Sequence, residues 1–335
     1  MQTFPVSNRT ILEPDLPIID SHHHLRDRLD SYYMFDDYVH DTQRGHNIVA
    51  SVYVECMAMH RPDGPEVLRP IGEIEFANGV AAVSATGKYG PCRIAAAIIG
   101  YADLTFGDAV AELLDRALAT APDRLRGFRQ CTLEHPDPGV WRYVPHPPAA
   151  GIMSHPQFRP GLKQLAARDL IFEFAVFHHQ LPEVAQLVDD FPNTTIVLNH
   201  IGQVAGIALK EADRADAFTQ WRRYIADLAR RPNVICKVGG MGQPYFGFGF
   251  ELRDTLPNYL ELASAWRPWA EAVIESFGVE RCMMESNYPL DSRSCGYVPL
   301  WNALKYIVRG ASSEEKAALF YKTAARVYRI NLPAL

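Results

Sequence analysis

The chain has 335 residues, of which 48% are hydrophobic and 21% are charged, a composition typical of soluble globular proteins. Its net charge of −6 at pH 7 argues against a nucleic-acid partner, because phosphate binding requires a basic face. No apolar run reaches the roughly 20 residues that a membrane-spanning helix needs, so we expect no membrane partner.

The sequence also favours a cytoplasmic location. Its first ten residues, MQTFPVSNRT, lack the basic and apolar regions of a signal peptide. Its six cysteines include no CxxC pair, which favours reduced thiols over a disulfide framework or a zinc knuckle.

Short apolar runs alternate with helical patterns along the chain. The first strand is expected over 17–24 (PIIDSHHH), and seven more are expected over 48–56, 93–104, 124–131, 170–179, 194–202, 233–240 and 281–289. Most of these runs are rich in Ile, Val and Phe, which is typical of strands buried on both faces. The segments between them carry apolar residues at three- and four-residue spacing, which predicts amphipathic helices.

Eight strands alternating with helices predict an α/β fold, a single (β/α)8 TIM barrel over 1–335 with 1–15 as an N-terminal extension. A doubly wound open sheet is the alternative. No GxGxxG motif follows the first strand, which disfavours a dinucleotide-binding version of that sheet. Two long segments, 132–158 and 241–258, follow the fourth and seventh strands. In a barrel both would be loops over the active-site face.

The first strand ends in three consecutive histidines. Residues two apart on a strand point to the same side, so we expect Asp20, His22 and His24 to share the barrel interior and His23 to point away. Taken alone, these histidines could simply be solvated polar residues at a strand end. Replacing His22 or His24 should abolish turnover, whereas replacing His23 should chiefly affect stability.

Polar side chains also occur at most of the other predicted strand ends. Each of them has an alternative explanation as part of a salt bridge at the rim. In a barrel, however, the carboxyl ends of all strands converge on one pocket. The residues are Glu55, Arg129, His178, His179, Asn199, His200, Lys237, Glu285, Asn287 and Asp291.

Six segments together resemble the amidohydrolase-2 family of the amidohydrolase superfamily. They are IIDSHHHL, GFRQ, HHQLPEV, TTIVLNHIG, CKVGGMG and RCMMESNYPLD. The resemblance runs from about residue 16 to 330 and is nearest to the branch of sugar-lactone and pyrone-dicarboxylate lactonases. It implies a TIM-barrel hydrolase that acts on a small molecule, and oligomers are common among such barrels.

The resemblance implies roles for particular residues. His22 and His24 match metal ligands of the members that bind a divalent metal. His178 matches the metal ligand at the end of the fifth strand. Because His179 stands next to it, the sequence does not decide which of the two histidines occupies that position. His200 matches the histidine that polarises the substrate carbonyl or moves protons.

One position departs from the family pattern. Asn287 stands where the family's SDWP motif has an aspartate that binds metal and acts as general base. An amide cannot accept a proton at neutral pH or supply negative charge to a metal. Glu285, Asp291 and His200 are then the candidate bases, and Glu285 is favoured. A site with a divalent metal such as zinc and a metal-independent site both stay open.

The remaining polar residues suggest an acidic substrate. Arg129 is suited to holding a carboxylate or an oxyanion, although a salt bridge with Glu55 or Glu173 would also explain it. Glu55, Lys237 and Tyr245 are further candidates for substrate binding, and Tyr245 begins an aromatic run. A ring-containing acid, such as a lactone from aromatic catabolism, would suit this set.

Three functions are compatible with these patterns. The leading one is a hydrolase that opens a lactone with activated water, and the absence of a GxSxG motif counts against a serine esterase. A non-oxidative decarboxylase or a hydratase of an aromatic or unsaturated acid is the alternative. A binding protein without activity is the third.

Overall fold

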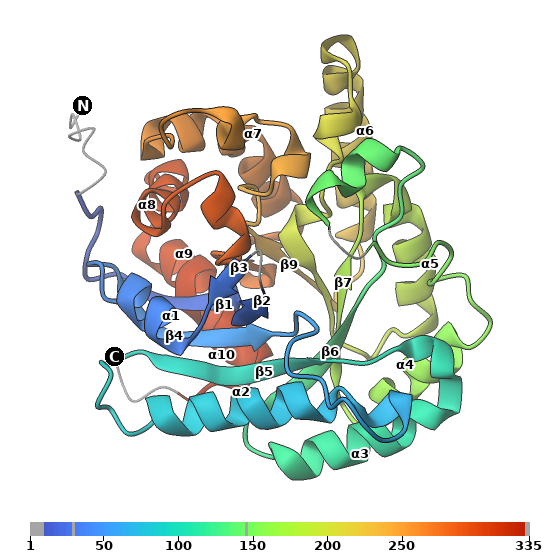
Figure 1. Ribbon diagram of the computed structural model, residues 1–335. Helices are drawn as coiled ribbons and strands as arrows, with labels where there is room; N and C mark the ends of the chain where they lie inside the picture. The colour runs from blue at the N-terminus through green and yellow to red at the C-terminus, as the bar shows by residue number, and fades with distance from the viewer. Residues whose placement is uncertain (1–9, 29–30, 145–146, 332–335) are drawn as a thin grey trace.

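The computed structural model describes residues 10–28, 31–144 and 147–331, and it has the predicted barrel architecture (Figure 1). Within these residues eight parallel strands form one sheet in the order in which they occur in the chain. None of the described helices is long and apolar enough to cross a bilayer. The strands are β1 (Pro17–His23), β4 (Asn47–Val54), β5 (Arg93–Tyr101), β6 (Leu125–Cys131), β7 (Ile171–Ala175), β8 (Ile196–Leu198), β9 (Val234–Val238) and β10 (Cys282–Met284).

The first and last strands meet and nearly close the sheet into a barrel. The main-chain N–H of His24 donates to the carbonyl oxygen of Tyr288 at 2.8 Å. The N–H of Asn287 donates to the carbonyl oxygen of His22 at 2.9 Å. These two bonds place the ends of β1 and β10 side by side, so the predicted (β/α)8 fold is confirmed.

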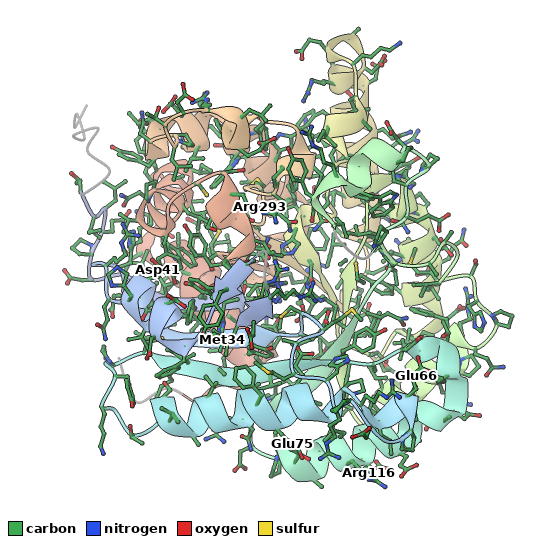
Figure 2. The ribbon with its side chains drawn as sticks, viewed as in Figure 1. Met34, Asp41, Glu66, Glu75, Arg116 and Arg293 are labelled. Carbon is green, nitrogen blue, oxygen red and sulfur yellow. The ribbon has the colours of Figure 1, made fainter. Side chains whose placement is uncertain are left out.

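Helices surround the barrel and carry charged side chains such as Glu75 and Arg116 on their outer faces (Figure 2). A hairpin of β2 (Arg26–Arg28) and β3 (Ser31–Tyr33) follows β1 directly. The helices are α1 (Phe35–Thr42), α2 (Ile71–Ser84), α3 (Val110–Thr120), α4 (Phe158–Ala166), α5 (Leu181–Asp190), α6 (Arg214–Leu228), α7 (Tyr259–Phe277), α8 (Tyr297–Ile307), α9 (Ser313–Ala317) and α10 (Thr323–Val327).

Two apolar layers hold the barrel together. The larger layer packs the strands against the surrounding helices. The smaller one fills the barrel interior with inward-facing side chains such as Ile19, Val52 and Met283. Val327 and Tyr328, at the end of the last helix, belong to the inner layer. The C-terminal segment therefore closes the amino end of the barrel and leaves the carboxyl end for a site.

The predicted loops and extension are only partly described. The segment 132–158 contains a short 3-10 helix, η3 (Pro138–Tyr143), and its residues 145–146 lie outside the described residues. The segment 241–258 contains η8 (Pro244–Phe246) and η9 (Phe250–Leu252). Residues 1–9 of the predicted N-terminal extension also lie outside the described part of the chain, whereas Leu12 is buried.

Candidate active site

A cavity of about 180 Å3 opens at the carboxyl ends of the strands. Both predicted loops contribute to its wall, through Tyr143 and Val144 from one and Gln243 and Tyr245 from the other. A larger cavity, of about 280 Å3, lies at the amino ends of β7, β8 and β9. We place the site in the smaller one because His24 and His200 line it and because the carboxyl ends of barrel strands carry active sites.

The end of β1 departs from the expected alternation. The pairing with β4 is irregular between Asp20 and His23, so one extra residue is inserted there. Asp20 consequently points out of the barrel, where its oxygens accept hydrogen bonds from Ser286 and from the hydroxyl of Tyr38. The expectation that Asp20 shares the face of His22 and His24 is therefore wrong. Asp20 instead links β1 to the chain after β10, and burial raises its pKa to about 6.

His23 lies on the outer side of the barrel wall. Its ring stacks on Tyr38 with centroids 4.0 Å apart, and its Nδ1 lies 2.9 Å from the carbonyl oxygen of Val52. A carbonyl oxygen can only accept, so Nδ1 carries the proton. Burial lowers the pKa of His23 to about 3, and the imidazole is neutral.

His22 and His24 face each other inside the barrel. Their Nε2 atoms are 3.1 Å apart. Nδ1 of His24 lies 2.7 Å from the carbonyl oxygen of Val54 and must donate to it, so Nε2 of neutral His24 holds a lone pair. Burial lowers the pKa of both imidazoles well below the usual range.

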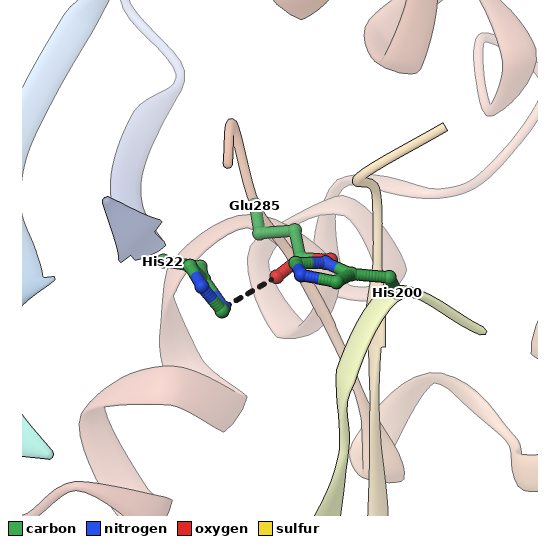
Figure 3. Close-up of side chains that lie close together, drawn as sticks. All are labelled: His22, His200 and Glu285. Carbon is green, nitrogen blue, oxygen red and sulfur yellow. Dashed lines mark hydrogen bonds and ion pairs between the residues drawn. The ribbon is translucent and has the colours of Figure 1, made fainter. Parts of the chain in front are cut away.

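Glu285 and His200 form a close pair beside His22 (Figure 3). Oε1 of Glu285 lies 2.6 Å from Nδ1 of His200, and Oε2 lies 3.1 Å from Nδ1 of His22. His200 lines the cavity, whereas Glu285 is completely buried behind it. The carboxylate therefore accepts from Nδ1 of His200 and leaves Nε2 of that ring for other partners.

Two glycines after β9 make room for this pair. A Cβ on Gly239 would lie 2.4 Å from Cγ of Glu285, and one on Gly240 would lie 2.3 Å from Nδ1 of His200. Gly240 also has a φ of 64°, which favours glycine. The GG of CKVGGMG is therefore required by the close approach of the two functional side chains.

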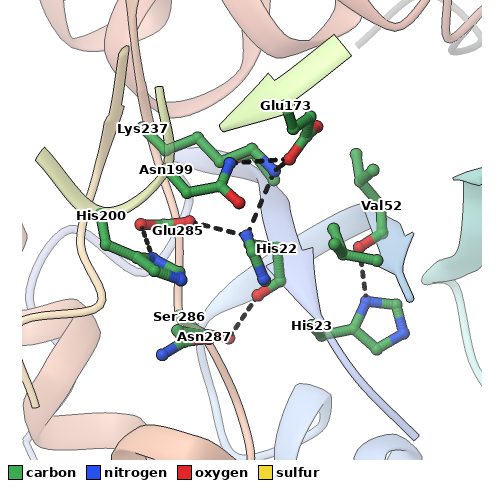
Figure 4. A network of polar contacts seen from close by, with 12 residues as sticks. His22, His23, Val52, Glu173, Asn199, His200, Lys237, Glu285, Ser286 and Asn287 are labelled. Carbon is green, nitrogen blue, oxygen red and sulfur yellow. Dashed lines mark hydrogen bonds and ion pairs between the residues drawn. The ribbon is translucent and has the colours of Figure 1, made fainter. Parts of the chain in front are cut away.

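Lys237 contacts His22 in the barrel interior (Figure 4). Its Nζ is 2.7 Å from Oε2 of Glu173, which also accepts from Asn199, and 3.2 Å from Nδ1 of His22. Lys237 is completely buried and does not line the cavity, so the structure does not place it for the predicted contact with substrate. Burial lowers its pKa, and its ammonium group balances the buried Glu173.

Nδ1 of His22 thus lies between an ammonium group and a carboxylate. It can accept from Lys237, in which case Nε2–H donates to His24. In the other tautomer Nδ1 carries the proton and Nε2 holds a lone pair; Oε2 of Glu285 lies 3.1 Å from Nδ1 but is not hydrogen-bonded to it. The two tautomers differ in whether His22 and His24 can bind a common ligand.

Arg129 reaches the cavity but is held by protein groups. Its Nε donates to Oε1 of Glu55 at 2.7 Å and its Nη2 to the carbonyl oxygen of Glu55 at 2.6 Å. Nη1 lies 3.3 Å from Oδ1 of Asn199 and 3.2 Å from Nε2 of His22. The salt bridge with Glu55 considered above is therefore present, and the structure does not leave the guanidinium free for bidentate capture of a substrate carboxylate.

Asn287 and Asp291 lie beside the cavity and bind each other. Nδ2 of Asn287 donates to Oδ1 of Asp291 at 2.8 Å, and the N–H of Gly242 donates to Oδ2 at 2.8 Å. Burial raises the pKa of Asp291 well above its usual range. Asp291 therefore fixes the orientation of the Asn287 amide. The buried Oδ1 of Asn287 has no hydrogen-bond partner among the described residues, and neither Asn287 nor Asp291 lines the cavity.

The structure does not place His178 beside His22, His24, His200 and Glu285. β7 ends at Ala175, and the chain turns into η4 (His178–Gln180), where the N–H of His178 donates to the carbonyl oxygen of Gln203. Burial lowers the pKa of His178 to about 4. The strand was predicted over 170–179 because its apolar pattern continues beyond the residue at which β7 ends. Neither His178 nor His179 lines the cavity. Of the aromatic run that begins at Tyr245, only Tyr245 itself lines it.

The donor atoms fit a divalent metal ion. His22, His200 and Glu285 offer ligand atoms that all lie within 4.8 Å of one another. The 3.1 Å between the two Nε2 atoms of His22 and His24 is close to the ~3.3 Å expected between neighbouring nitrogen ligands of tetrahedral zinc. The Nδ1 bonds of His24 and His200 are of the kind that orient metal-binding imidazoles.

Sequence reasoning missed other residues of the cavity wall. Arg26 and Arg28 come from the β2–β3 hairpin, Cys56 and Gln203 come from two further βα loops, and Tyr101 is the last residue of β5. Only the two arginines had a recognisable signal, because HLRDR directly continues the HxH motif.

Comparisons with known proteins identify relatives by sequence and by fold. L-fucono-1,5-lactonase of Burkholderia multivorans is 27% identical over 242 residues, which is 71% of this chain and 73% of that protein. The crystal structure of an amidohydrolase from Burkholderia multivorans with bound zinc superposes with a TM-score of 0.71 at 24% identity. The alignment covers 94% of this chain and 99% of that one.

Two further matches extend over almost the whole chain. The uncharacterised protein y4mH of Sinorhizobium fredii is 33% identical over 330 residues, which is 94% of this chain and 99% of that protein. The family model described as amidohydrolase matches residues 19–330. The chain belongs to the amidohydrolase family.

Proposed function

We propose that this protein opens a small lactone by hydrolysis and that His200 and Glu285 move the protons. The 2.6 Å contact between Glu285 and His200 carries the proposal, because it joins a buried carboxylate to an imidazole on the cavity wall. The relationship to L-fucono-1,5-lactonase supports a cyclic ester as the substrate class.

The chemistry follows from the orientation of His200. Glu285 accepts from Nδ1–H, so Nε2 can take a proton from water as that water attacks the lactone carbonyl. The carboxylate stabilises the imidazolium that forms. The imidazolium then protonates the ring oxygen as its bond to the carbonyl carbon breaks, and the product is a hydroxy acid. No covalent enzyme intermediate is required.

The neighbouring cation assists the same step. Arg129 lines the cavity while it is bound to Glu55, so its charge is fixed in position. A fixed positive charge stabilises the oxyanion of the tetrahedral intermediate at little reorganisation cost. Arg129 is therefore proposed as an electrostatic contributor and Glu55 as the residue that positions it.

A metal is compatible with this scheme. The facing Nε2 atoms of His22 and His24 would hold it and leave Nε2 of His200 free for proton transfer, and the zinc in the related Burkholderia multivorans structure makes zinc the first candidate. When bound, such an ion supplies Lewis acidity at the carbonyl and lowers the pKa of water.

The proposal is tested by incubating the enzyme with a panel of sugar lactones and pyrone lactones. Acid release at constant pH and NMR of the products report ring opening. Glu285→Gln and His200→Asn should lose at least about a hundredfold in kcat/KM, while the control His178→Asn should retain activity. Ring opening by none of the lactones, together with carbon dioxide release from aromatic acids, would instead identify a decarboxylase.

A further inference from the structure

We propose that Tyr328 and Glu173 are positioning residues of the proposed reaction, which hold His22 and Arg129 in place from inside the barrel. The inference rests on the proposed lactone hydrolysis and adds to it the buried groups on which the geometry of the site depends. Neither Tyr328 nor Glu173 lines the cavity, so both act through other residues.

Tyr328 extends from the C-terminal segment into the barrel interior. It directly follows α10, and its side chain is completely buried in the inner apolar layer. Arg126 of β6 fixes the main chain there, because its Nε donates to the carbonyl oxygen of Tyr328 at 2.6 Å. Burial raises the pKa of Tyr328 well above its usual value of about 10, so the phenol keeps its proton. The hydroxyl is therefore a fixed hydrogen-bond donor inside the barrel.

This hydroxyl donates to Glu173 on β7. Its oxygen lies 2.6 Å from Oε1 of Glu173, and it is the one donor to that atom among the described residues. Oε2 accepts from Nζ of Lys237 and from Nδ2 of Asn199, each at 2.7 Å. The ring of Tyr328 also lies near Lys237, with Nζ 5.5 Å from the ring centroid. Both oxygens of the carboxylate are occupied, which fixes its orientation.

Two contacts lead from Glu173 to residues of the candidate site. Lys237 makes the first, because its Nζ lies 3.2 Å from Nδ1 of His22 (Figure 4). Asn199 makes the second, because its Oδ1 accepts from Nη1 of Arg129 at 3.3 Å. The amide nitrogen of Asn199 donates to Glu173, which leaves the amide oxygen for Arg129. One buried carboxylate therefore positions both a histidine and the guanidinium proposed to stabilise the oxyanion.

Removal of the Tyr328 hydroxyl would leave Oε1 of Glu173 buried without a donor. An unpartnered buried oxygen is costly, so the carboxylate should turn toward other donors and loosen its contacts with Lys237 and Asn199. The charge of Arg129 would then be less well aligned with the tetrahedral intermediate, and such a loss lowers kcat more than it changes KM. A purely structural Tyr328 would instead affect stability and leave kcat of the folded enzyme unchanged.

The first test is lactone turnover by Tyr328→Phe, which removes the hydroxyl and keeps the ring. Its kcat should fall by roughly five- to twentyfold, with KM nearly unchanged. The matched control is Tyr53→Phe, because the hydroxyl of Tyr53 also donates to a buried carboxylate, Oε1 of Glu73, at 2.9 Å. That oxygen keeps the main-chain N–H of Cys56 as a donor, so the control should retain its kcat. Circular dichroism shows whether each variant is folded.

Glu173→Gln tests whether Tyr328 acts through the carboxylate. The amide has the size of the carboxyl group, but its nitrogen cannot accept from Lys237 or Asn199. The variant should lose at least as much kcat as Tyr328→Phe, and combining the two should cost no more, because both changes act on one group. If the unpaired Lys237 prevents folding, Glu173→Gln with Lys237→Met takes its place. Losses in kcat that multiply in the combined variant would overturn the proposal.

A readout without turnover separates this inference from the proposed function. Imidazole nitrogen NMR of protein with isotope-labelled histidine reports the surroundings of Nδ1 of His22, and His22→Gln assigns its signals. In Tyr328→Phe the His22 signals should move and those of His178 should stay. Movement without turnover of any lactone by the wild type would preserve the positioning role and refute the hydrolysis. Unchanged His22 signals, or an unchanged kcat in Tyr328→Phe, would refute the positioning role even where lactones are hydrolysed.

Discussion

Replacing His23 by phenylalanine should make the protein less sensitive to acid while leaving catalysis intact. His23 is buried on the outer side of the barrel wall, its ring stacks on Tyr38, and its Nε2 has no partner. Protonation would place a charge at that Nε2, which explains why burial holds the pKa at about 3. Phenylalanine keeps the stacking and cannot titrate.

The expected size follows from proton linkage. The folded-state pKa of His23 is depressed, so its contribution to stability is present above the unfolded value of about 6.5 and is lost as pH falls toward 3. Between pH 7 and pH 5 the unfolded histidine takes up a proton and the folded one does not. At 1.36 kcal/mol per pH unit below 6.5, the wild type should lose about 2 kcal/mol from this residue.

The variant should start less stable, because the carbonyl of Val52 loses its donor at a cost of about 1–3 kcal/mol. Urea unfolding of both proteins at pH 7 and pH 5 measures the difference. The gap between them, taken as wild type minus variant, should fall by about 2 kcal/mol from pH 7 to pH 5, and turnover at pH 7 should be retained. A gap that stays constant, or loss of activity in His23→Phe alone, would refute the assigned orientation of the three histidines.

Two further predictions concern the interior of the barrel. Gly240→Ala should abolish most activity in a folded protein, because its Cβ would displace His200. Gly79→Ala on α2 is the control and should keep its activity, because a Cβ there meets nothing within 4 Å. Equal activity of the two variants in kinetic assays would contradict the close packing. After incubation with zinc, elemental analysis should find the metal retained by His178→Ala and lost by His24→Ala; loss from both would restore His178 as a ligand.

The fold could be predicted from the sequence because both faces of each barrel strand are buried. Near-continuous apolar runs therefore marked most of the strands, and the first was expected over 17–24 and observed over Pro17–His23. The same reasoning failed at the end of β7, because Val176 and Phe177 continue the apolar pattern after the strand has ended. Apolar burial does not distinguish a strand from the turn that follows it.

The site was predicted where strand alternation holds and missed where local geometry intervenes. Alternation placed His22 and His24 together correctly. The irregular pairing of β1 with β4 turned Asp20 outward, and no period-two pattern reveals such an insertion. Whether Arg129 binds Glu55 or a substrate depends on distances, which composition and spacing do not contain. The arginines of β2 were missed because a three-residue strand is too short for a periodic signal.

The central claim is that Glu285 and His200 act as one proton-transfer unit. The most direct measurement is kcat/KM for one lactone in the wild type, Glu285→Gln, His200→Asn and the double variant. Residues that act as a unit are not additive, so the double variant should be no slower than the slower single variant. Losses that multiply in the double variant, or a Glu285→Gln enzyme as active as the wild type, would contradict the account.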